Sequence, residues 1–454
     1  MINTDIIILA AGKGTRMKSS LPKVLHPLAG KSLLGHVMAT AETVENAEIT
    51  VVTGHGAEAV ENMFANTAHK FVQQTEQLGT AHAVATALPC LRDDARVLVL
   101  YGDVPLIKPE TISKMLTAVT DKSIGLLTVT LDNPTGYGRI LRDNNGQVEA
   151  IVEQKDAQPE QLTINEVNTG VISLTTALLQ QWLPKIDNKN AQKEYYLTDL
   201  IAIARDAGYA IEAIQPESVA EVEGVNNRQQ LAALERELQK QQAQQLMMSG
   251  TTLADPSRFD QRGVITAGTD NFIDINCLFI GHVTLGSGVT IGPNCTIIDS
   301  VIGDGVEIKA NSILEQTTVA ANAVIGPFAR LRPGTELGEG SKVGNFVETK
   351  KALVGKGSKI NHLSYVGDAE LGKDVNVGAG TITCNYDGVN KHKTEIGDGA
   401  FIGSNSSLVA PVVIGEGATV GAGSTVSKSA PEDQLTLTRA KQRSFPDWKR
   451  PEKK

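Results

Sequence analysis

The sequence of residues 396–426 reads IGDGAFIGSNSSLVAPVVIGEGATVGAGSTV. Aliphatic residues occupy every sixth position of this stretch, at Ile396, Ile402, Leu408, Ile414, Val420 and Val426. A period of six matches neither an α-helix, with about 3.6 residues per turn, nor the alternation of about two residues in a strand. It is the signature of a parallel β-helix, in which each hexad forms one flat face and three faces close one coil.

An earlier stretch repeats the pattern, with aliphatic residues at Val319, Ile325, Leu331, Leu337 and Val343. Glycine follows many of these residues, at Gly326, Gly338, Gly344, Gly397, Gly403, Gly415 and Gly421. We expect the aliphatic side chains to point inward and stack on their copies in neighbouring coils, with the small residues at the crowded corners. A β-helix with this signature is left-handed, an exception to the usual right-handed crossover rule.

The period breaks between residues 377 and 396, where the segment 381–395 intrudes. We predict that roughly thirteen of its residues leave the coil as a loop. Such an insertion is either a tolerated surface loop or a functional element. The functional interpretation is favoured because loops on a rigid scaffold often carry binding and catalytic residues.

The first half of the chain alternates short apolar runs with amphipathic stretches. The predicted strands are Ile6–Ala10, Ile49–Thr53, Val97–Tyr101 and Ile124–Val129, and predicted helices include Leu33–Val44 and Glu110–Val119. This rhythm predicts an α/β fold with a Rossmann-like, mostly parallel sheet.

Residues 227–247 contain no glycine or proline, and their leucines lie at Leu231, Leu234, Leu238 and Leu246. This spacing predicts a long polar helix with a narrow apolar stripe, which serves as a rigid linker. We therefore predict an N-terminal domain at 1–226, a helical linker at 227–247 and a β-helix domain at 248–454.

The net charge of −9 and the pI near 5.5 argue against nucleic acid or an anionic membrane as a partner. The four cysteines have no paired or CxxC spacing, which excludes a zinc ribbon and suits a reducing compartment. The apolar run Ile6–Leu9 is too short for a signal peptide or a membrane span. We expect a cytoplasmic protein whose basic residues gather locally at any phosphate site.

The first predicted strand leads into the segment AAGKGTRM at residues 10–17. Gly12 and Gly14 let backbone N–H groups approach phosphate oxygens, while Lys13, Arg16 and Lys23 supply positive charge. The spacing is not that of a Walker A loop. Taken alone, the glycines are equally compatible with an ordinary turn between a strand and a helix.

Asp103 follows the very apolar strand Val97–Tyr101, at the sheet edge where α/β proteins bind ligands. A carboxylate at this edge suits Mg²⁺ that bridges phosphates, because Mg²⁺ usually takes one or two protein ligands and keeps several waters. The alternative is that Asp103 only caps a turn.

Basic residues also gather in the second half of the chain. Arg332 and Lys350 are eighteen residues apart, so we expect them to stack on one face of the solenoid as a phosphate clamp. A solvated charged face is the alternative. His362 follows this cluster and precedes the inserted loop, and a histidine is the side chain suited to accept a proton near neutral pH. Cys384 lacks an activating base nearby and is interpreted as incidental.

Six further motifs make the match to a known family specific. They are Gln73–His82, Pro134–Arg139, Ile151–Glu153, Asn168–Gly170, Glu194–Tyr196 and Glu221–Asn226. With the segment at 10–17, they resemble the bifunctional N-acetylglucosamine-1-phosphate uridyltransferase and glucosamine-1-phosphate N-acetyltransferase family. The resemblance covers essentially the whole chain.

This resemblance implies a first reaction in which the sugar phosphate attacks the α-phosphorus of UTP and expels pyrophosphate, with Mg²⁺ as cofactor. It implies that Arg16 and Lys23 neutralise charge and that Asp103 and Asn226 bind Mg²⁺. The residues implied to hold the nucleotide and the sugar are Leu9, Ala10, Ala11, Gly12, Lys23, Gln74, Gly79, Thr80, Tyr101, Gly102, Asp103, Gly138, Glu153, Asn168 and Asn226.

For the second reaction, acetyl transfer from acetyl-CoA to glucosamine-1-phosphate, the resemblance implies His362 as the general base. The residues implied to hold the sugar phosphate are Arg332, Lys350, Tyr365 and Asn376. The residues implied to contact acetyl-CoA are Ala379, Asn385, Tyr386, Ser404, Ala422 and Arg439. The resemblance also implies a homotrimer.

Two competing interpretations stay open at this point. In the first, the chain is a monofunctional nucleotidyltransferase whose β-helix only oligomerises or regulates it. In the second, the β-helix is a binding scaffold without enzymatic activity. The presence of His362, the inserted loop and the Arg332 and Lys350 pair opposes the first, and Asp103 with the glycine loop opposes the second.

Overall fold

The computed structural model describes residues 3–451 and residue 453, and its residues divide into two compact units at Leu238 and Gln239. Helix α7 (Arg228–Met248) contains this division. The predicted linker helix is therefore present. Among the described residues, no helix is both long and apolar enough to cross a membrane.

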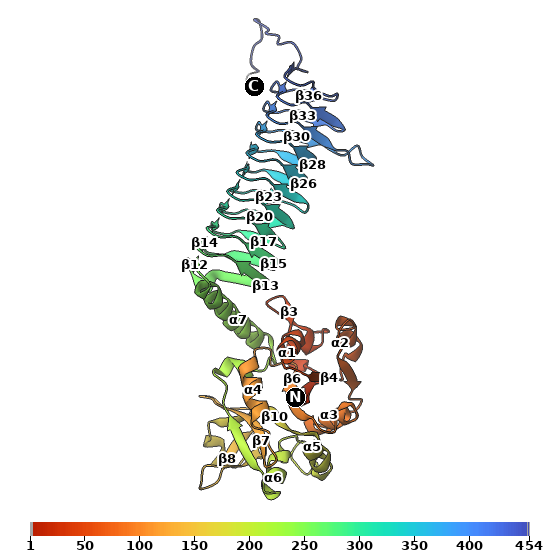
Figure 1. Cartoon of the computed structure of the whole chain (residues 1–454), viewed down its shortest axis with the longest axis vertical. Helices are drawn as coiled ribbons and strands as arrows, with labels where there is room; N and C mark the ends of the chain where they lie inside the picture. Colours follow the sequence, from red (N-terminus) through yellow and green to blue (C-terminus); the bar gives the residue numbers. More distant parts are fainter. Residues whose placement is uncertain (1–2, 452, 454) are drawn as a thin grey trace. The chain divides into compact units, whose positions relative to one another are not determined.

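The first unit is a mixed sheet with the strand order β11-β7-β10-β6-β1-β4-β5 (Figure 1). Strand β10 pairs antiparallel with β6 and β7, and the other pairs of this path are parallel. The strands are β1 (Thr4–Leu9), β4 (Ala47–Thr53), β5 (Lys70–Gln73), β6 (Arg96–Tyr101), β7 (Ser123–Thr130), β8 (Arg139–Arg142), β9 (Val148–Val152), β10 (Glu166–Thr175) and β11 (Ala210–Ile214). A short hairpin joins β2 (Pro27–Leu28) to β3 (Lys31–Ser32).

Helices cover both faces of this sheet because its central strands are apolar on both sides. In β1, Ile6 and Ile8 pack into one apolar cluster and Ile7 and Leu9 into the other. The first cluster takes residues from α1 (Leu33–Ala41), α2 (Ala57–Met63) and α4 (Pro109–Thr117), and the second from α3 (Thr80–Ala87), α5 (Thr176–Trp182) and α6 (Asp199–Asp206). The predicted α/β domain is confirmed.

The second unit is a left-handed parallel β-helix, as the hexads predict. One face consists of β12 (Thr251–Leu253), β14 (Asn271–Ile273), β16 (Thr290–Ile291), β19 (Glu307–Ile308), β22 (Val324–Ile325), β25 (Lys342–Asn345), β27 (Lys359–His362), β29 (Asn376–Val377), β32 (Phe401–Ile402), β35 (Thr419–Val420) and β37 (Leu435–Thr436). The other faces contain β13 (Phe259–Ala267), β15 (Cys277–Leu285), β17 (Thr296–Ile298), β18 (Val301–Ile302), β20 (Ile313–Glu315), β21 (Thr317–Val319), β23 (Arg330–Leu331), β24 (Thr335–Leu337), β26 (Glu348–Val354), β28 (Tyr365–Leu371), β30 (Ile382–Cys384), β31 (Thr394–Ile396), β33 (Ser407–Val409), β34 (Val412–Ile414) and β36 (Thr425–Val426).

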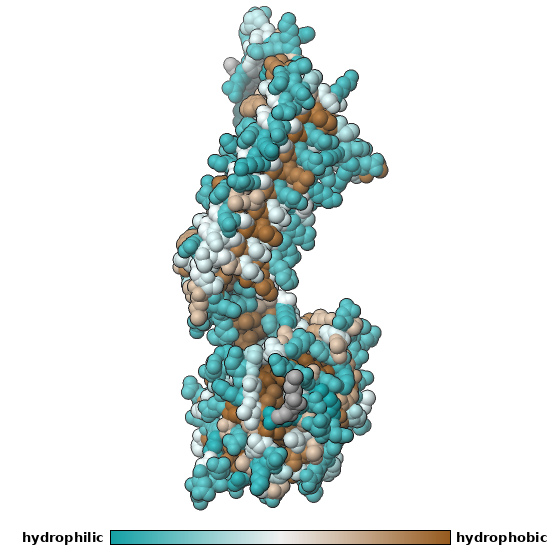
Figure 2. All heavy atoms as spheres, in the orientation of Figure 1, coloured by the Kyte–Doolittle hydropathy of each residue, from teal (hydrophilic) through white to brown (hydrophobic). Residues whose placement is uncertain are grey.

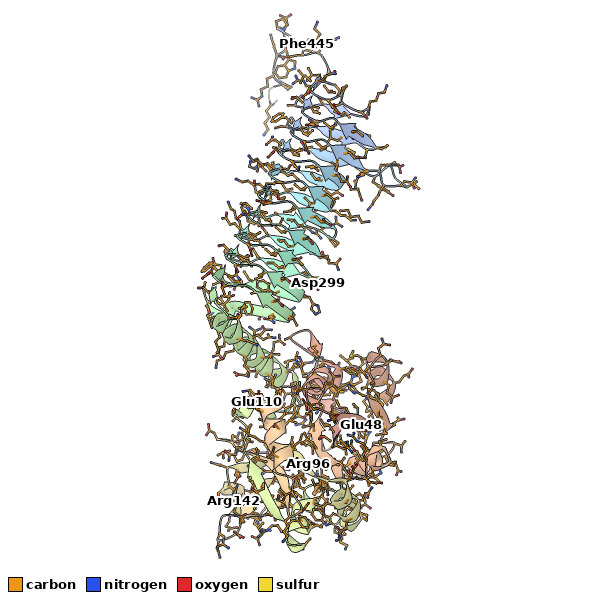
Figure 3. The ribbon with its side chains drawn as sticks, viewed as in Figure 1. Glu48, Arg96, Glu110, Arg142, Asp299 and Phe445 are labelled. Carbon is orange, nitrogen blue, oxygen red and sulfur yellow. The ribbon has the colours of Figure 1, made fainter. Side chains whose placement is uncertain are left out.

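The interior of the β-helix is the stack of hexad aliphatics, which form one continuous buried cluster. Its corners are crowded: a Cβ on Gly403 would lie 2.4 Å from the backbone nitrogen of Ala422, so a larger residue would displace the next coil. Side chains also satisfy corner backbone groups, and Oδ1 of Asp299 (Figure 3) accepts a hydrogen bond from the His282 backbone N–H at 2.9 Å. Some apolar side chains nevertheless reach the surface of this unit (Figure 2).

The inserted loop is shorter than we predicted. Residues 382–384 continue the coil as β30, and residues 394–396 re-enter it as β31, so the excursion comprises residues 385–393. It connects β30 to β31 and protrudes from the side of the β-helix (Figure 1). The prediction of about thirteen residues was wrong because Ile382 and Thr383 keep the strand register with Ser407 and Leu408 of the next coil.

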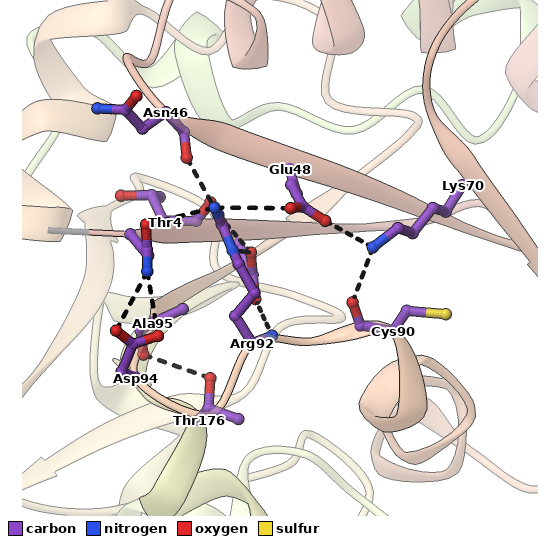
Figure 4. A network of polar contacts seen from close by, with 11 residues as sticks. Thr4, Asn46, Glu48, Lys70, Cys90, Arg92, Asp94, Ala95 and Thr176 are labelled. Atoms are coloured by element: carbon purple, nitrogen blue, oxygen red, sulfur yellow. Dashed lines mark hydrogen bonds and ion pairs between the residues drawn. The ribbon is translucent and has the colours of Figure 1, made fainter.

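A buried ion pair fastens β1, β4 and β6 at their amino ends (Figure 4). Asp5 is almost fully buried, and it accepts hydrogen bonds from the Arg92 backbone N–H at 2.6 Å and from its Nε at 2.8 Å. Nη2 of Arg92 also donates to the carbonyl oxygens of Thr4 and Asn46. One guanidinium thus joins segments that are far apart in the sequence.

We expect Arg92→Ala to lower the free energy of unfolding of the first unit by about 3–5 kcal/mol, because it leaves a buried carboxylate without its partner. Urea unfolding followed by the fluorescence of the buried Trp182 measures this. The control is Lys189→Ala, which removes an ion pair whose side chains are 86% and 58% exposed. It should change stability by less than about 1 kcal/mol, and equal effects of the two variants would contradict the assignment.

Candidate functional site

A cavity of about 360 Å³ opens at the carboxyl ends of β1 and β6. The predicted nucleotide-site residues that line it are Leu9, Ala10, Ala11, Gly12, Lys23, Gln74, Gly79, Thr80, Tyr101 and Asp103. Lys13, which we predicted to supply positive charge to a phosphate, lines it as well. So do Gln77 and Glu194, for which the sequence predicted no individual role. Residues from five separate segments of the chain therefore meet at one edge of the sheet.

The glycine loop is fixed at its base and open toward the cavity. The Ala10 backbone N–H donates to Val52 O at 2.8 Å, which ties the loop to β4. Gly14 has a φ of +59°, a left-handed conformation that favours glycine. No atom lies within 4 Å of the position that a Cβ on Gly12 would take, so a ligand has room to approach this backbone.

Four predicted residues converge beside the cavity. Lys23 forms an ion pair with Asp103, and their side chains are only 13% and 17% exposed. Oδ1 of Asn226 accepts hydrogen bonds from Lys23 Nζ at 3.3 Å and from Arg16 Nη2 at 2.9 Å. The segment that carries Asn226 is held in place by the Val225 backbone N–H, which donates to Asp103 O at 2.9 Å.

The donor set of this cluster fits Mg²⁺. Asp103 offers a carboxylate and Asn226 an amide oxygen, the hard oxygen ligands that Mg²⁺ prefers. Both oxygens already contact the Lys23 ammonium, so this position attracts a cation. No group of three or more His, Cys, Asp or Glu side chains suited to a metal occurs among the described residues, and two protein ligands match an ion that keeps mostly water and phosphate.

Tyr101 and Asn168, two of the residues predicted to hold the sugar, line a small hollow together. The Asn168 backbone N–H donates to Gly138 O at 2.9 Å, and a Cβ on Gly138 would lie 3.3 Å from Oε1 of Glu153. Burial raises the pKa of the Tyr101 hydroxyl, with Asp103 and Glu153 adding to the effect. Burial also raises the pKa of Glu153. Burial therefore disfavours the charged forms of both side chains.

Glu221 helps to position the segment that leads to Asn226, a function that we did not predict from the sequence. Its buried carboxylate accepts hydrogen bonds from Thr111 Oγ1 at 2.6 Å and from the Glu217 backbone N–H at 3.0 Å. These contacts anchor the segment that ends at Asn226. Only its place in the motif Glu221–Asn226 hinted at this function.

In the β-helix, Arg332 and Lys350 lie on adjacent coils. The Arg332 backbone N–H donates to Thr349 O, in the register that pairs Arg330 with Glu348. A hydrogen bond with Lys391 and its positive charge lower the pKa of Lys350, and the positive charge of Arg332 lowers this pKa further. Arg332 Nη1 also donates to Glu348 Oε1 at 2.7 Å, so this carboxylate orients one of the cations.

His362 ends β27 and lies one coil above Asn345, with which it is in strand register. Its Nδ1 lies 2.7 Å from Oδ1 of Asn345. An amide oxygen only accepts hydrogen bonds, so Nδ1 carries the ring proton and Nε2 is left with a lone pair. The seventeen-residue separation of the two was the one sequence signal that could have identified Asn345.

Above His362, the residues predicted for acetyl-CoA follow one corner of the β-helix. Ala379 O accepts a hydrogen bond from the Asn405 backbone N–H, and Ser404 O accepts one from that of Gly423. These bonds stack Ala379, Ser404 and Ala422, while Arg439 Cδ lies near Gly423. Asn376 lies on the face before this corner, one coil above Lys359.

The base of the inserted loop packs on its own coil. Nδ2 of Asn385 lies 3.5 Å from the Tyr365 hydroxyl and donates to Asp368, and Lys393 forms an ion pair with Glu370 at 2.7 Å. Tyr386, in contrast, is 59% exposed. Asn385 is thus next to Tyr365, whereas Tyr386 is available for a contact outside this chain.

Comparisons with known proteins cover both units. The family described as "MobA-like NTP transferase domain" matches residues 6–156, and "Bacterial transferase hexapeptide (six repeats)" matches residues 393–428. The chain is 60% identical to "Bifunctional protein GlmU" of Marinobacter nauticus over 99% of both chains. It is 59% identical to the protein of that name from Cellvibrio japonicus, over 99% of both chains. It is 53% identical to that of Acinetobacter baumannii, over 100% of this chain and 99% of the other.

If His362 is the general base that the family resemblance implies, we expect Asn345→Leu to lower the turnover of acetyl transfer by about 10–100-fold, as for residues that orient metal-bound histidines. The Asn345 oxygen holds the ring proton on Nδ1. Without it, the proton can occupy Nε2, which then has no lone pair to accept a proton. Asn345→Asp keeps an acceptor oxygen in place and should retain most activity. A leucine variant with near-normal turnover would show that Asn345 does not position the ring.

Proposed function

This chain belongs to the family of bifunctional GlmU proteins, and we propose that its two reactions have separate sites in its two units. It acetylates glucosamine-1-phosphate with acetyl-CoA and transfers the uridylyl group of UTP to N-acetylglucosamine-1-phosphate, releasing pyrophosphate. We assign uridyl transfer to residues 1–226, the linker to 227–247 and acetyl transfer to 248–454. The observation that carries the proposal is the cluster of Arg16, Lys23, Asp103 and Asn226 beside the cavity.

In uridyl transfer, an oxygen of the sugar phosphate forms a bond to the α-phosphorus of UTP as the bond to pyrophosphate breaks. We assign the nucleotide to the cavity-lining residues and the sugar to Tyr101, Gly102, Gly138, Glu153 and Asn168. Asp103 and Asn226 would hold Mg²⁺, which supplies positive charge to the phosphates. Lys23 and Arg16 stabilise the charge that develops on the phosphate oxygens, so catalysis is positioning and charge neutralisation.

In acetyl transfer, the amine of glucosamine-1-phosphate attacks the thioester carbonyl. Nε2 of His362 takes the proton from the attacking nitrogen as the C–N bond forms, and the C–S bond then breaks to release the CoA thiolate. We assign the sugar phosphate to Arg332, Lys350, Tyr365 and Asn376, and acetyl-CoA to Ala379, Asn385, Tyr386, Ser404, Ala422 and Arg439. The position of Arg332 and Lys350 on adjacent coils, with Lys391 and Arg332 lowering the pKa of Lys350, supports an anion at this position.

The chain's partners in this proposal are its small-molecule substrates and two further copies of itself in a homotrimer. Large apolar residues at successive corners support an interface, since Phe328, Phe346 and Leu363 are 49%, 57% and 62% exposed. The exposed tip of the inserted loop supports a site that a neighbouring copy completes through Tyr386. The co-substrates UTP and acetyl-CoA, with four unpaired thiols, support a cytoplasmic location.

The separation of the two sites predicts opposite effects of two substitutions. Asp103→Asn removes a metal-ligand charge and should lower uridyl transfer by at least about 100-fold while sparing acetylation. His362→Ala should lower acetyl transfer by about 10²–10⁴-fold while sparing uridyl transfer. The assays are pyrophosphate release with UTP and thiol release with acetyl-CoA. A folded variant that loses both activities would argue against separate sites.

The shared site predicts recovery of activity in mixed trimers. His362→Ala and Tyr386→Ala chains, each with little acetylation activity alone, are unfolded and refolded together. If Tyr386 completes the neighbour's site, some mixed trimers contain one intact site and part of the activity returns. Proven mixing of subunits without any recovery would place both residues in the site of a single chain.

A further inference from the structure

Gln74 lines the nucleotide cavity with a side-chain amide whose two hydrogens are both in use. It follows β5, and its backbone N–H donates to Thr53 O at 2.8 Å. Its Nε2 lies 3.2 Å from Gly79 O and 3.0 Å from Nδ1 of His82. An amide nitrogen carries two hydrogens, so these two acceptors occupy both.

The chemistry of the two acceptors fixes which end of the amide faces them. Gly79 O is a carbonyl and only accepts, so the nitrogen of Gln74 must face it. Nδ1 of His82 then also accepts, which places the ring proton of His82 on its Nε2. The oxygen Oε1 is therefore the atom that Gln74 has left to offer a ligand, and it offers only an acceptor.

The two acceptors are themselves held rigidly. Gly79 precedes α3 with a φ of +120°, and a Cβ there would lie 2.5 Å from Tyr195 O. The Ala81 backbone N–H donates to Tyr195 O at 3.0 Å, and Thr80 Oγ1 accepts a hydrogen bond from the Leu197 backbone N–H at 3.0 Å. The turn that carries Gly79 and His82 cannot shift easily to suit another amide orientation.

We propose that His82, acting through Gln74, is a positioning residue that restricts the nucleotide site to pyrimidine bases with a hydrogen on N3. Uracil donates its N3–H to Oε1, whereas cytosine presents a lone pair at N3 and is repelled. To accept cytosine, the amide must rotate by half a turn, which directs Oε1 at the carbonyl oxygen of Gly79 and requires His82 to move its ring proton from Nε2 to Nδ1. This inference rests on the proposed nucleotide site.

Two substitutions at His82 separate its acceptor from its volume. His82→Asn keeps an acceptor oxygen at the position of Nδ1, whereas His82→Leu has nearly the same size as asparagine and has no acceptor. The uridyltransferase reaction is assayed with UTP, CTP and dTTP in the full-length protein. Thymine carries the same N3–H as uracil, so dTTP reports general damage to the base pocket.

In His82→Leu, we expect the ratio of kcat/KM for UTP to that for CTP to fall about tenfold, the value of one hydrogen bond. The UTP to dTTP ratio should stay within about threefold of the wild-type ratio. His82→Asn should keep both ratios near their wild-type values. His82→Ala removes the same acceptor and replaces the leucine variant if that variant does not fold.

Three results would overturn the inference in distinguishable ways. An unchanged UTP to CTP ratio in the leucine and alanine variants would show that His82 does not set the orientation of Gln74. Unchanged kinetics with UTP in Gln74→Ala would instead show that this cavity does not bind the base, and the proposed nucleotide site would fail with it. Equal loss of selectivity in His82→Asn and His82→Leu would assign the effect to packing.

Discussion

The second unit depends on one constraint, the stacking of parallel coils at the spacing of β-strands, about 4.8 Å. Coil stacking at this distance makes residues seventeen or eighteen positions apart immediate neighbours, as Glu307, Val324 and Lys342 show. It also forces the aliphatic residues inward and leaves no room for side chains at certain corners, such as Gly403. Equivalent positions in successive coils form columns, and most columns repeat one type of residue. A position that departs from the type of its column therefore indicates a function other than coil stacking.

In the first unit, the ends of the sheet strands place the site residues. Its parallel strands end together, so the segments after β1, β5 and β6 meet at one edge and form the cavity. Arg92 and Asp5 fasten the opposite, amino ends of the sheet. The ion pair of Arg92 with Asp5 thus lies at the opposite end of the sheet from the cavity, which is lined by the paired and mostly buried Lys23 and Asp103.

The sequence predicted the features that depend on periodicity or on a motif. The hexads from Ile396 to Val426 predicted the β-helix, and the branched residues of Ile6–Ala10 predicted β1. It could not predict the size of the inserted loop, because whether Ile382 stays in the coil depends on pairing with Ser407. Nor could it predict Asn345 or the orientation of Gln74, since each is defined by a hydrogen bond to a side chain or carbonyl that only the fold brings near.

The corner that carries His362 shows how a repeating fold makes room for a ligand. The left-handed positions Phe328, Phe346 and Leu363 are large and apolar, and two of their rings stack with centroids 5.3 Å apart. Above His362 the equivalent positions become Gly380, Asn405 and Gly423, and the preceding residues become Ala379, Ser404 and Ala422. The change in side-chain size therefore occurs at the coil of the histidine. In the proposed function, acetyl-CoA lies along the small residues, against the backbone of several coils, with its thioester at Nε2. If the bulky residues also occupied the coils above His362, they would fill this space. If small residues occupied the whole column, no bulky side chain would limit how far the ligand extends along it.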